Sequence, residues 1–349
     1  MAIDRISDFG FRISDLLHKC AEAQRVCPEH VEGCRSVQGW GCVVLPAIAG
    51  GGLLVLAPLW LSDYAIHVLI ISLYYTILAA SWNLLAGYTG QFSLAHHAFA
   101  AIGGYASGLL IHHFDVPIYL GIIAAVFVSL VFGFLLGVLV LKMRAIYLAI
   151  ATWAFAETTR ILVTAGYQIT RGDLGLHVPS LFGTLEPRPY YYLFLGLTFI
   201  CISIMYFIVR SPIGSFMRAI KDDELAAAAM GVDTVRWKLF VFSVTSCLAG
   251  VAGVFYGHYI GLLSPVMMQF YEIGKIIIMV IIGGLGSFVG PLIGAPLVVI
   301  LFEYLREYAE WRVVVFALLV IAMMRLHREG AVSLLRRLYL SLFHPKYHP

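Results

Sequence analysis

Residues 116–141 read VPIYLGIIAAVFVSLVFGFLLGVLVL, and no Asp, Glu, Lys or Arg interrupts them. About 20 apolar residues in an α-helix cross a hydrocarbon core about 30 Å thick, so this stretch is long enough to span a membrane. Its apolar residues run continuously, whereas strands of an outer-membrane barrel alternate with a period of two. The stretch therefore predicts a transmembrane α-helix.

The rest of the chain has the same character. Its 349 residues are 61% hydrophobic and only 12% charged, whereas soluble domains carry about 25% charged residues. Three further stretches, 64–114, 239–271 and 276–302, also lack Asp, Glu, Lys and Arg. The sequence predicts an all-α polytopic membrane protein.

The apolar pattern predicts about ten transmembrane or re-entrant helices. The segments are 41–61, 65–86, 93–111, 117–141, 146–164, 189–209, 239–262, 273–289, 291–303 and 313–325. The segment at 291–303 is short and carries Gly294 and Pro296, which favours a re-entrant or broken helix. The segment at 93–111 holds two histidines and several glycines, which favours close packing against other helices over contact with lipid.

The distribution of basic residues predicts the orientation. With a cytoplasmic N-terminus, the inside segments hold 17 of the 23 Lys and Arg. Because cytoplasmic loops of membrane proteins are enriched in Lys and Arg, we expect both termini in the cytoplasm. The basic residues lie at helix ends, so we expect no nucleic-acid partner.

Three regions are expected: a membrane domain at 39–325 and two cytoplasmic ends. Residues 1–38 are polar and repeat an Arg-Ile-Ser-Asp motif seven residues apart, without the apolar positions of a coiled coil. We predict a poorly ordered extension there and a basic tail at 326–349. The six cysteines lack the spacing of a metal site, so we expect no metal.

The cytoplasmic loop at 210–238 carries the strongest functional signal. Acidic residues at 222–224 suit a helix N-terminus, the alanines at 226–229 favour helix, and a following glycine suits its end. Such a short helix is either a docking surface for another protein or an ordinary amphipathic connector. The residues singled out are Arg218, Asp222, Asp223, Glu224, Ala227, Ala228 and Gly231.

Two glycine-rich stretches, at 87–105 and 283–295, come before and after this loop. Non-helical backbone at membrane depth is tolerated where it is buried in protein or lines a cavity. The stretches therefore belong either to the translocation path and its gate or to close helix contacts. The candidates for the path are Gln91, Ser93, His96, Gly103, Gly283, Gly284 and Gly286.

The loop and both stretches together resemble the permease family of ATP-binding cassette (ABC) importers for branched-chain amino acids. The resemblance covers most of residues 65–300. It implies that Glu224, Ala227 and Gly231 lie in a loop that seats in a cleft of an ATPase subunit. It also implies a sister permease, an external solute-binding protein, and the bacterial inner membrane. The implied substrate is a branched-chain or other small amino acid, with urea, amides or another small organic solute as the alternative.

The chain departs from the family at two places. A second acidic residue among the alanines is missing, and Lys275 stands where the family usually has an acidic residue. Glu272 lies three residues earlier, on the same helix face, and can compensate as an ion-pair partner. The reversed charge leaves the substrate class open.

Glu157 lies within a predicted span, where an ionisable residue is costly and marks function by default. It belongs either to the path or to an ion pair with Arg160. A secondary transporter or channel working alone is the other class considered, but it usually shows paired intramembrane charges and inverted repeats. The sequence has no Walker motif, so we expect ATP and Mg²⁺ to bind a partner chain, and no enzymatic motif is found.

Overall fold

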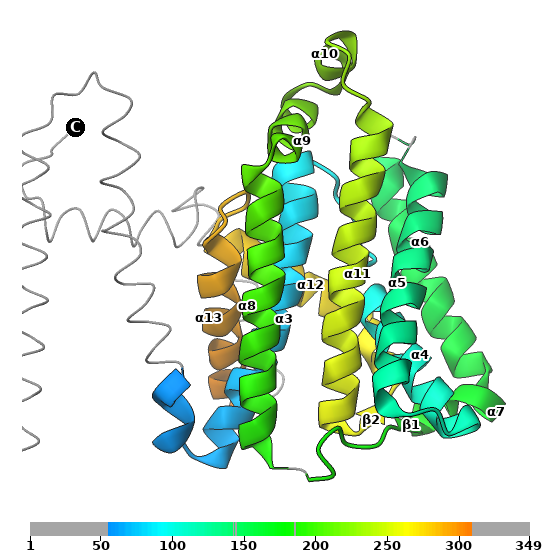
Figure 1. Cartoon of the computed structure of the whole chain (residues 1–349), viewed down its shortest axis with the longest axis vertical. Coiled ribbons are helices and arrows are strands. Elements are labelled where there is room, and N and C mark those ends of the chain that lie inside the picture. Colours follow the sequence, from blue (N-terminus) through cyan, green and yellow to red (C-terminus); the bar gives the residue numbers. More distant parts are fainter. Residues whose placement is uncertain (1–54, 142, 144, 185, 309–349) are drawn as a thin grey trace, which may run out of the picture. The chain divides into compact units, whose positions relative to one another are not determined.

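The computed structural model describes residues 55–141, 143, 145–184 and 186–308 (Figure 1). The chain divides into two units, residues 1–62 and 63–349. Residues 55–62 of the first unit include the short helix η1 (Ala57–Leu59). The predicted extension, the tail and the span at 313–325 lie outside the described residues, as does most of the span at 41–61.

The described part of the second unit is mostly helical. Its longer helices are α3 (Asp63–Thr89), α4 (His96–Phe114), α5 (Ile118–Val140), α6 (Ala145–Ala165), α8 (Pro187–Arg210), α11 (Thr234–Ile260), α12 (Phe270–Gly283) and α13 (Gly290–Tyr304). Five of them, α3, α5, α6, α8 and α11, are long and apolar enough to cross a membrane. The polytopic all-α fold is therefore confirmed, with each of these helices close to a predicted segment.

Short elements mark the two ends of the helix bundle in Figure 1. One end holds α9 (Pro212–Asp222) and α10 (Glu224–Ala229). The opposite end holds α7 (Tyr167–Thr170) and strands β1 (Leu176–His177) and β2 (Leu262–Leu263), which pair antiparallel. The helices η2 (Gly172–Leu174), η3 (Pro265–Met268) and η4 (Leu305–Tyr308) complete the described unit.

Helices α4 and α11 approach each other so closely that their backbones touch. A Cβ atom added at Gly253 would lie 1.8 Å from the carbonyl oxygen of Ala100, and one added at Gly103 would lie 2.4 Å from that of Gly250. No side chain fits at such distances, so glycine is required at both positions. Small residues allow this approach in membrane proteins, where packing rather than water exclusion holds helices together.

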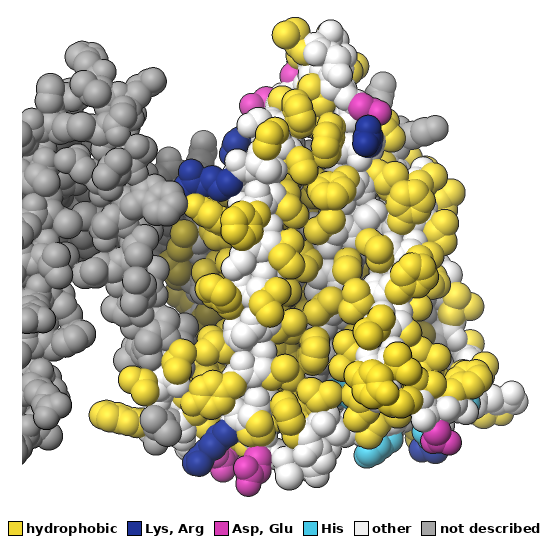
Figure 2. All heavy atoms as spheres, viewed as in Figure 1, with side chains coloured by type: hydrophobic (Ala, Val, Ile, Leu, Met, Phe, Trp, Pro, Cys, Tyr) yellow, Lys and Arg dark blue, Asp and Glu magenta, His cyan; other side chains and the backbone are white. Residues whose placement is uncertain are grey.

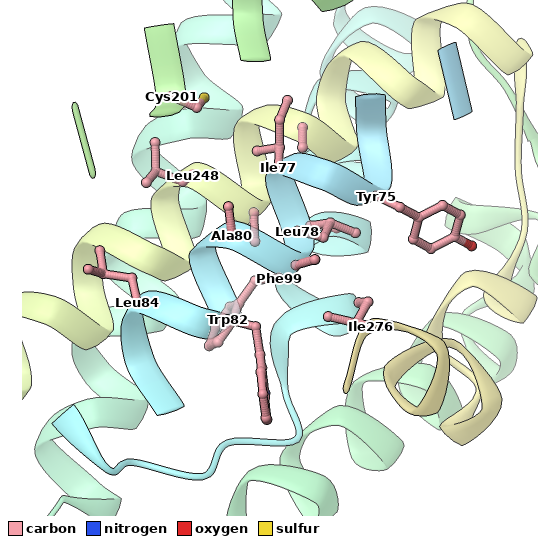
Figure 3. Packing of buried hydrophobic residues seen from close by; sticks show 14 of the residues in the cluster. Tyr75, Ile77, Leu78, Ala80, Trp82, Leu84, Phe99, Cys201, Leu248 and Ile276 are labelled. Carbon is pink, nitrogen blue, oxygen red and sulfur yellow. The ribbon is translucent and has the colours of Figure 1, made fainter. Parts of the chain in front are cut away.

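The core is centred on α3, whereas the outer helices present apolar side chains to the surroundings. Ile77, Leu78 and Trp82 of α3 are buried among neighbouring helices (Figure 3). Phe199 of α8 and Leu139 of α5 are more than two-thirds exposed. Figure 2 shows hydrophobic side chains along the length of the helices and charged ones gathered near the two ends. This is the surface that a helix bundle presents to lipid.

Two predicted spans differ from the observed helices at glycines. Helix α12 ends at Gly283 rather than running to residue 289, because Gly284 and Gly286 adopt positive φ values of 113° and 78°. Helix α4 begins at His96 rather than at residue 93, after a non-helical segment that includes Gly90 with φ 71°. Both breaks place non-helical backbone between helices.

Candidate functional site

The segment between α8 and α11 folds as two helices joined at an extended residue. Asp223 has φ −154° and ψ 109°, and its Oδ1 accepts hydrogen bonds from the backbone N–H of Leu225 at 2.9 Å and Ala226 at 3.0 Å. This side chain caps α10 and supplies negative charge at its N-terminus. Gly231, with φ 86°, follows the end of α10. Asp223, Glu224 and Gly231 occupy the positions that the sequence pattern predicts, whereas Asp222 is the last residue of α9 and not part of the N-terminus of α10.

The surface of α10 is apolar at its tip. Leu225 is 82% exposed and Met230 is 85% exposed, whereas Ala227 is buried. Figure 2 shows hydrophobic side chains at this end of the bundle. Glu224 is held by Lys238 of α11 at 2.5 Å, which fixes α10 to the longer helix. The sequence pattern indicated the alanines as the docking face, whereas the large apolar side chains exposed in the structure are Leu225 and Met230. Arg218, Asp222 and Ala228 are also exposed.

The same segment touches both glycine-rich stretches. Lys221 Nζ of α9 donates to the carbonyl oxygen of Gly87 at 2.7 Å, and it lies 3.6 Å from where a Cβ of Gly286 would be. Asn83 Oδ1 of α3 accepts from the backbone N–H of Gly286 at 2.8 Å, and its Nδ2 donates to the carbonyl oxygen of Ser287 at 2.9 Å. We call these five residues the glycine junction. It joins α9, the end of α3 and the loop between α12 and α13.

The other candidates near the junction are buried. Gln91 is 3% exposed, and both polar atoms of its side chain lack a partner among the described residues. Ser93 accepts a hydrogen bond from Trp82 Nε1 through its carbonyl oxygen at 2.8 Å. His96 is fully buried, and neither ring nitrogen has a partner in the described part of the chain. Gly283 lies against the loop backbone, where a Cβ would be 2.1 Å from the carbonyl oxygen of Gly290.

A cavity of about 560 Å³ lies among α3, α11, α12 and α13. It holds a compact polar cluster. Lys275 Nζ lies 2.8 Å from Glu272 Oε2 and donates to the hydroxyl of Tyr75 at 2.6 Å. That hydroxyl in turn donates to Glu272 Oε2 at 2.6 Å. The ammonium group also lies 4.8 Å from the ring centre of Tyr75 and 5.2 Å from that of Tyr271, within range of cation–π attraction. The predicted pairing of Lys275 with Glu272 is present.

The cavity shows which of the residues predicted for the translocation path lie at a common site. Glu157 does not line it, and its carboxylate pairs with Arg160 Nε at 3.0 Å on the same helix. His97 lines the cavity, whereas the neighbouring His96 does not. Tyr75 also lines the cavity, although one tyrosine in an apolar span has no sequence pattern that marks it as functional.

The comparisons with known proteins identify the family. The family model described as "Branched-chain amino acid transport system / permease component" matches residues 64–324. The chain belongs to this family. It is therefore a multi-pass membrane permease component of a transport system rather than an enzyme.

Individual relatives agree with this assignment. The permease is 29% identical to the high-affinity branched-chain amino acid transport system permease protein LivM of Escherichia coli K12, over 90% of this chain and 83% of the relative. It is 24% identical to the high-affinity branched-chain amino acid transport system permease protein LivH of Salmonella typhimurium LT2, over 72% and 88% of the two chains. It is also 25% identical to the ribose import permease protein RbsC of Haemophilus influenzae, over 53% and 59%. No solved structure matches the permease.

Proposed function

We propose that this chain is the transmembrane permease subunit of an ABC importer that moves branched-chain amino acids across the bacterial inner membrane. The family and the names of the relatives LivM and LivH support the substrate class. ATP hydrolysis belongs to a separate ATPase subunit. That subunit docks on α9 and α10, at the cytoplasmic end of the bundle.

The observation that carries the proposal is the contact between the docking segment and the glycine junction. Helix α9 reaches α3 through the bond from Lys221 to Gly87, and the same ammonium group lies 3.6 Å from where a Cβ of Gly286 would be. Helices α3, α12 and α13 also line the cavity. A movement of α9 on ATPase closure would therefore shift the helices that surround the cavity. ATP drives the change because it favours one of two arrangements of these helices.

We further propose that the permease pairs with a sister permease. Two different permease proteins, LivM and LivH, carry the same transport-system description in Salmonella typhimurium and in Escherichia coli, and this chain is similar to both. A heterodimer of related chains is the assembly that these names support. A solute-binding protein would deliver substrate at the end that holds β1 and β2.

The docking role is tested by placing charge on the tip of α10. In the double variant Leu225→Glu/Met230→Glu, two carboxylates must be desolvated where apolar side chains would be buried. Each apolar side chain buried at an interface contributes about 1.5–3 kcal/mol, so we expect ATPase binding to weaken at least about tenfold. The measurement is co-purification of the ATPase, together with ATP-dependent L-leucine uptake by proteoliposomes containing all subunits.

Leu174→Glu is the matched control for this experiment. Leu174 is 86% exposed and lies in η2, at the opposite end of the bundle. This variant should co-purify with the ATPase as the wild type does. Full ATPase binding and uptake by the Leu225→Glu/Met230→Glu variant would reject the docking surface. Failure of the wild-type complex to take up L-leucine with ATP would reject the proposed function.

A further inference from the structure

We infer that Glu272 and Lys275 form a binding site for the α-amino and α-carboxylate groups of an amino acid inside the cavity. This inference rests on the proposed function and assigns its substrate site. The ammonium group of the ligand would face Glu272, and the carboxylate would face Lys275. The aliphatic side chain would lie against the apolar wall of the same cavity.

The depth of the pair argues against a purely structural role. Tyr75, which contacts both charges, is the thirteenth of the 27 residues of α3, so the cluster lies about halfway along a membrane-spanning helix. Removing two charges from water costs more than their attraction usually returns, so such a pair is a poor way to stabilise a fold. Ionisable residues at this depth line substrate pathways by default.

The arrangement of the charges matches an amino acid. Glu272 and Lys275 lie one helical turn apart, and their side chains keep 20% and 16% exposure on the cavity side of the bundle. Opposite charges held 2.8 Å apart offer adjacent partners to the two charged groups of a zwitterion, which are themselves adjacent. The hydroxyl of Tyr75 can donate to a carboxylate or accept from an ammonium group.

His97 provides an independent sign that the site takes a ligand. Its Nε2 donates to the carbonyl oxygen of Met268 at 3.0 Å, which leaves Nδ1 as an acceptor. The side chain is 3% exposed, lines the cavity, and has no partner at Nδ1 among the described residues. A buried acceptor without a partner is costly unless something binds it. An ammonium group in the cavity would supply the missing donor.

The remaining wall favours an aliphatic side chain. Glu303 is the other described carboxylate that lines the cavity, and it already bonds the Tyr64 hydroxyl and Arg306 Nη1, the latter at 3.0 Å. Aliphatic residues from α3, α12 and α13 form one part of the wall, namely Ile71, Leu78, Ile276, Met279 and Val299, while Tyr74, Tyr256 and Ser264 line other parts. In Figure 3 the ring of Tyr75 projects from α3 away from Leu84 and Cys201.

The size and position of the cavity agree with this assignment. Its volume of about 560 Å³ falls within the roughly 300–1,000 Å³ of small-molecule sites. It extends to Leu262 of β2, at the end of the bundle opposite α9 and α10. Substrate delivered from outside would therefore reach it before the glycine junction. Urea, simple amides and ribose lack two opposite charges and cannot form an ion pair with either Glu272 or Lys275, so the site selects against them.

The test is the double variant Glu272→Gln/Lys275→Gln, which removes both charges and leaves neither one unpaired. In proteoliposomes with the ATPase, sister permease and binding protein, we expect L-leucine uptake to fall at least about tenfold, because two charge-assisted contacts are lost. Stimulation of ATPase activity by the binding protein should persist. The control is Asp63→Asn/Arg188→Gln, which neutralises an exposed pair 4.0 Å apart away from the cavity. It should transport as the wild type does.

A second readout keeps ligand binding separate from transport. In detergent, without binding protein or ATP, L-leucine should raise the unfolding temperature of the wild-type complex. Leucinamide and 4-methylpentanoate, which each lack one charged group, should raise it less. The double variant should not respond to L-leucine. The wild-type complex must take up L-leucine for the test to count. If the double variant then shows the same uptake or the same thermal shift as the wild type, this site is wrong and the proposed function still stands.

Discussion

Lys221 and Asn83 bind backbone groups of the glycine junction from two different helices. Lys221 reaches Gly87 from α9, while Asn83 binds Gly286 and Ser287 from within α3. Asn83 is 2% exposed, so its two hydrogen bonds satisfy its own buried amide group while they bind the loop backbone. Lys221 is exposed and lies at the surface of this arrangement. Asn83 therefore holds the loop against α3, and Lys221 connects the end of α3 to the docking segment.

Lys221→Met separates ATPase docking from transmission. The change removes the bond to Gly87 and leaves the exposed tip of α10 intact, so the ATPase should still co-purify. We expect ATP hydrolysis to continue while L-leucine uptake per ATP falls several-fold, because one charge-assisted contact between α9 and α3 is lost. Arg236→Met removes an exposed cation at the same end of the bundle and should change neither measurement. Wild-type uptake per ATP in the Lys221→Met variant would show that the movement takes another route.

At the scale of elements, the contact between α4 and α11 depends on glycines of both helices. Gly103 of α4 and Gly253 of α11 let carbonyl groups of the facing helix lie where side chains would otherwise be. Helix α4 also carries His97, so this contact fixes the position of one wall of the cavity. Helix α8 has no comparable requirement at Gly196, where an added Cβ would meet nothing within 4 Å.

Gly253→Ala should therefore destabilise the protein, because the new methyl group overlaps the backbone of Ala100. Overpacking of this kind costs about 1–3 kcal/mol. Gly196→Ala makes the same chemical change in α8 and should be neutral or stabilising by up to about 1 kcal/mol through helix propensity. Unfolding midpoints of the two variants in the same detergent give the comparison. Equal midpoints would contradict the close contact between α4 and α11.

At the scale of the whole molecule, the charge distribution predicts which end of the bundle faces the cytoplasm. The segment at 210–238, which includes α9 and α10, holds five of the basic residues, while loops at the opposite end carry few. Figure 2 shows charged side chains near both ends and a largely apolar surface between them. The proposed mechanism requires the end that holds α9 and α10 to be cytoplasmic.

Cysteine labelling tests that orientation. In a chain whose native cysteines are replaced by serine or alanine, Leu174→Cys and Leu225→Cys place one thiol at each end, at positions 86% and 82% exposed. A membrane-impermeant maleimide should label residue 174 in cells with a permeable outer membrane and an intact inner membrane. It should label residue 225 only after the inner membrane is opened. The opposite pattern would reverse the orientation and remove the docking proposal.

Much of the fold could be predicted from sequence because the membrane imposes a simple rule. Helices α3, α5, α8 and α11 lie close to uncharged apolar runs, since a chain in lipid must satisfy its backbone hydrogen bonds internally. The predicted ends of α12 and the predicted start of α4 differ from the observed ones by several residues. Glycines there adopt conformations that depend on what packs against them, and spacing along the chain does not contain that information.

The candidate site divides along the same line. The sequence by itself determined the local features, namely a helix that starts at the acidic residues, its end at Gly231 and the pairing of Glu272 with Lys275. Each of these involves residues within one turn or one short loop. Only the tertiary structure brought Tyr75 to Lys275, which is 200 residues away, and Lys221 to Gly87, which is 134 residues away. Apolar helices have many possible neighbours in lipid, and close backbone packing at glycines selects among them. This packing forms the cavity and the glycine junction, and no single segment of the sequence specifies either of them.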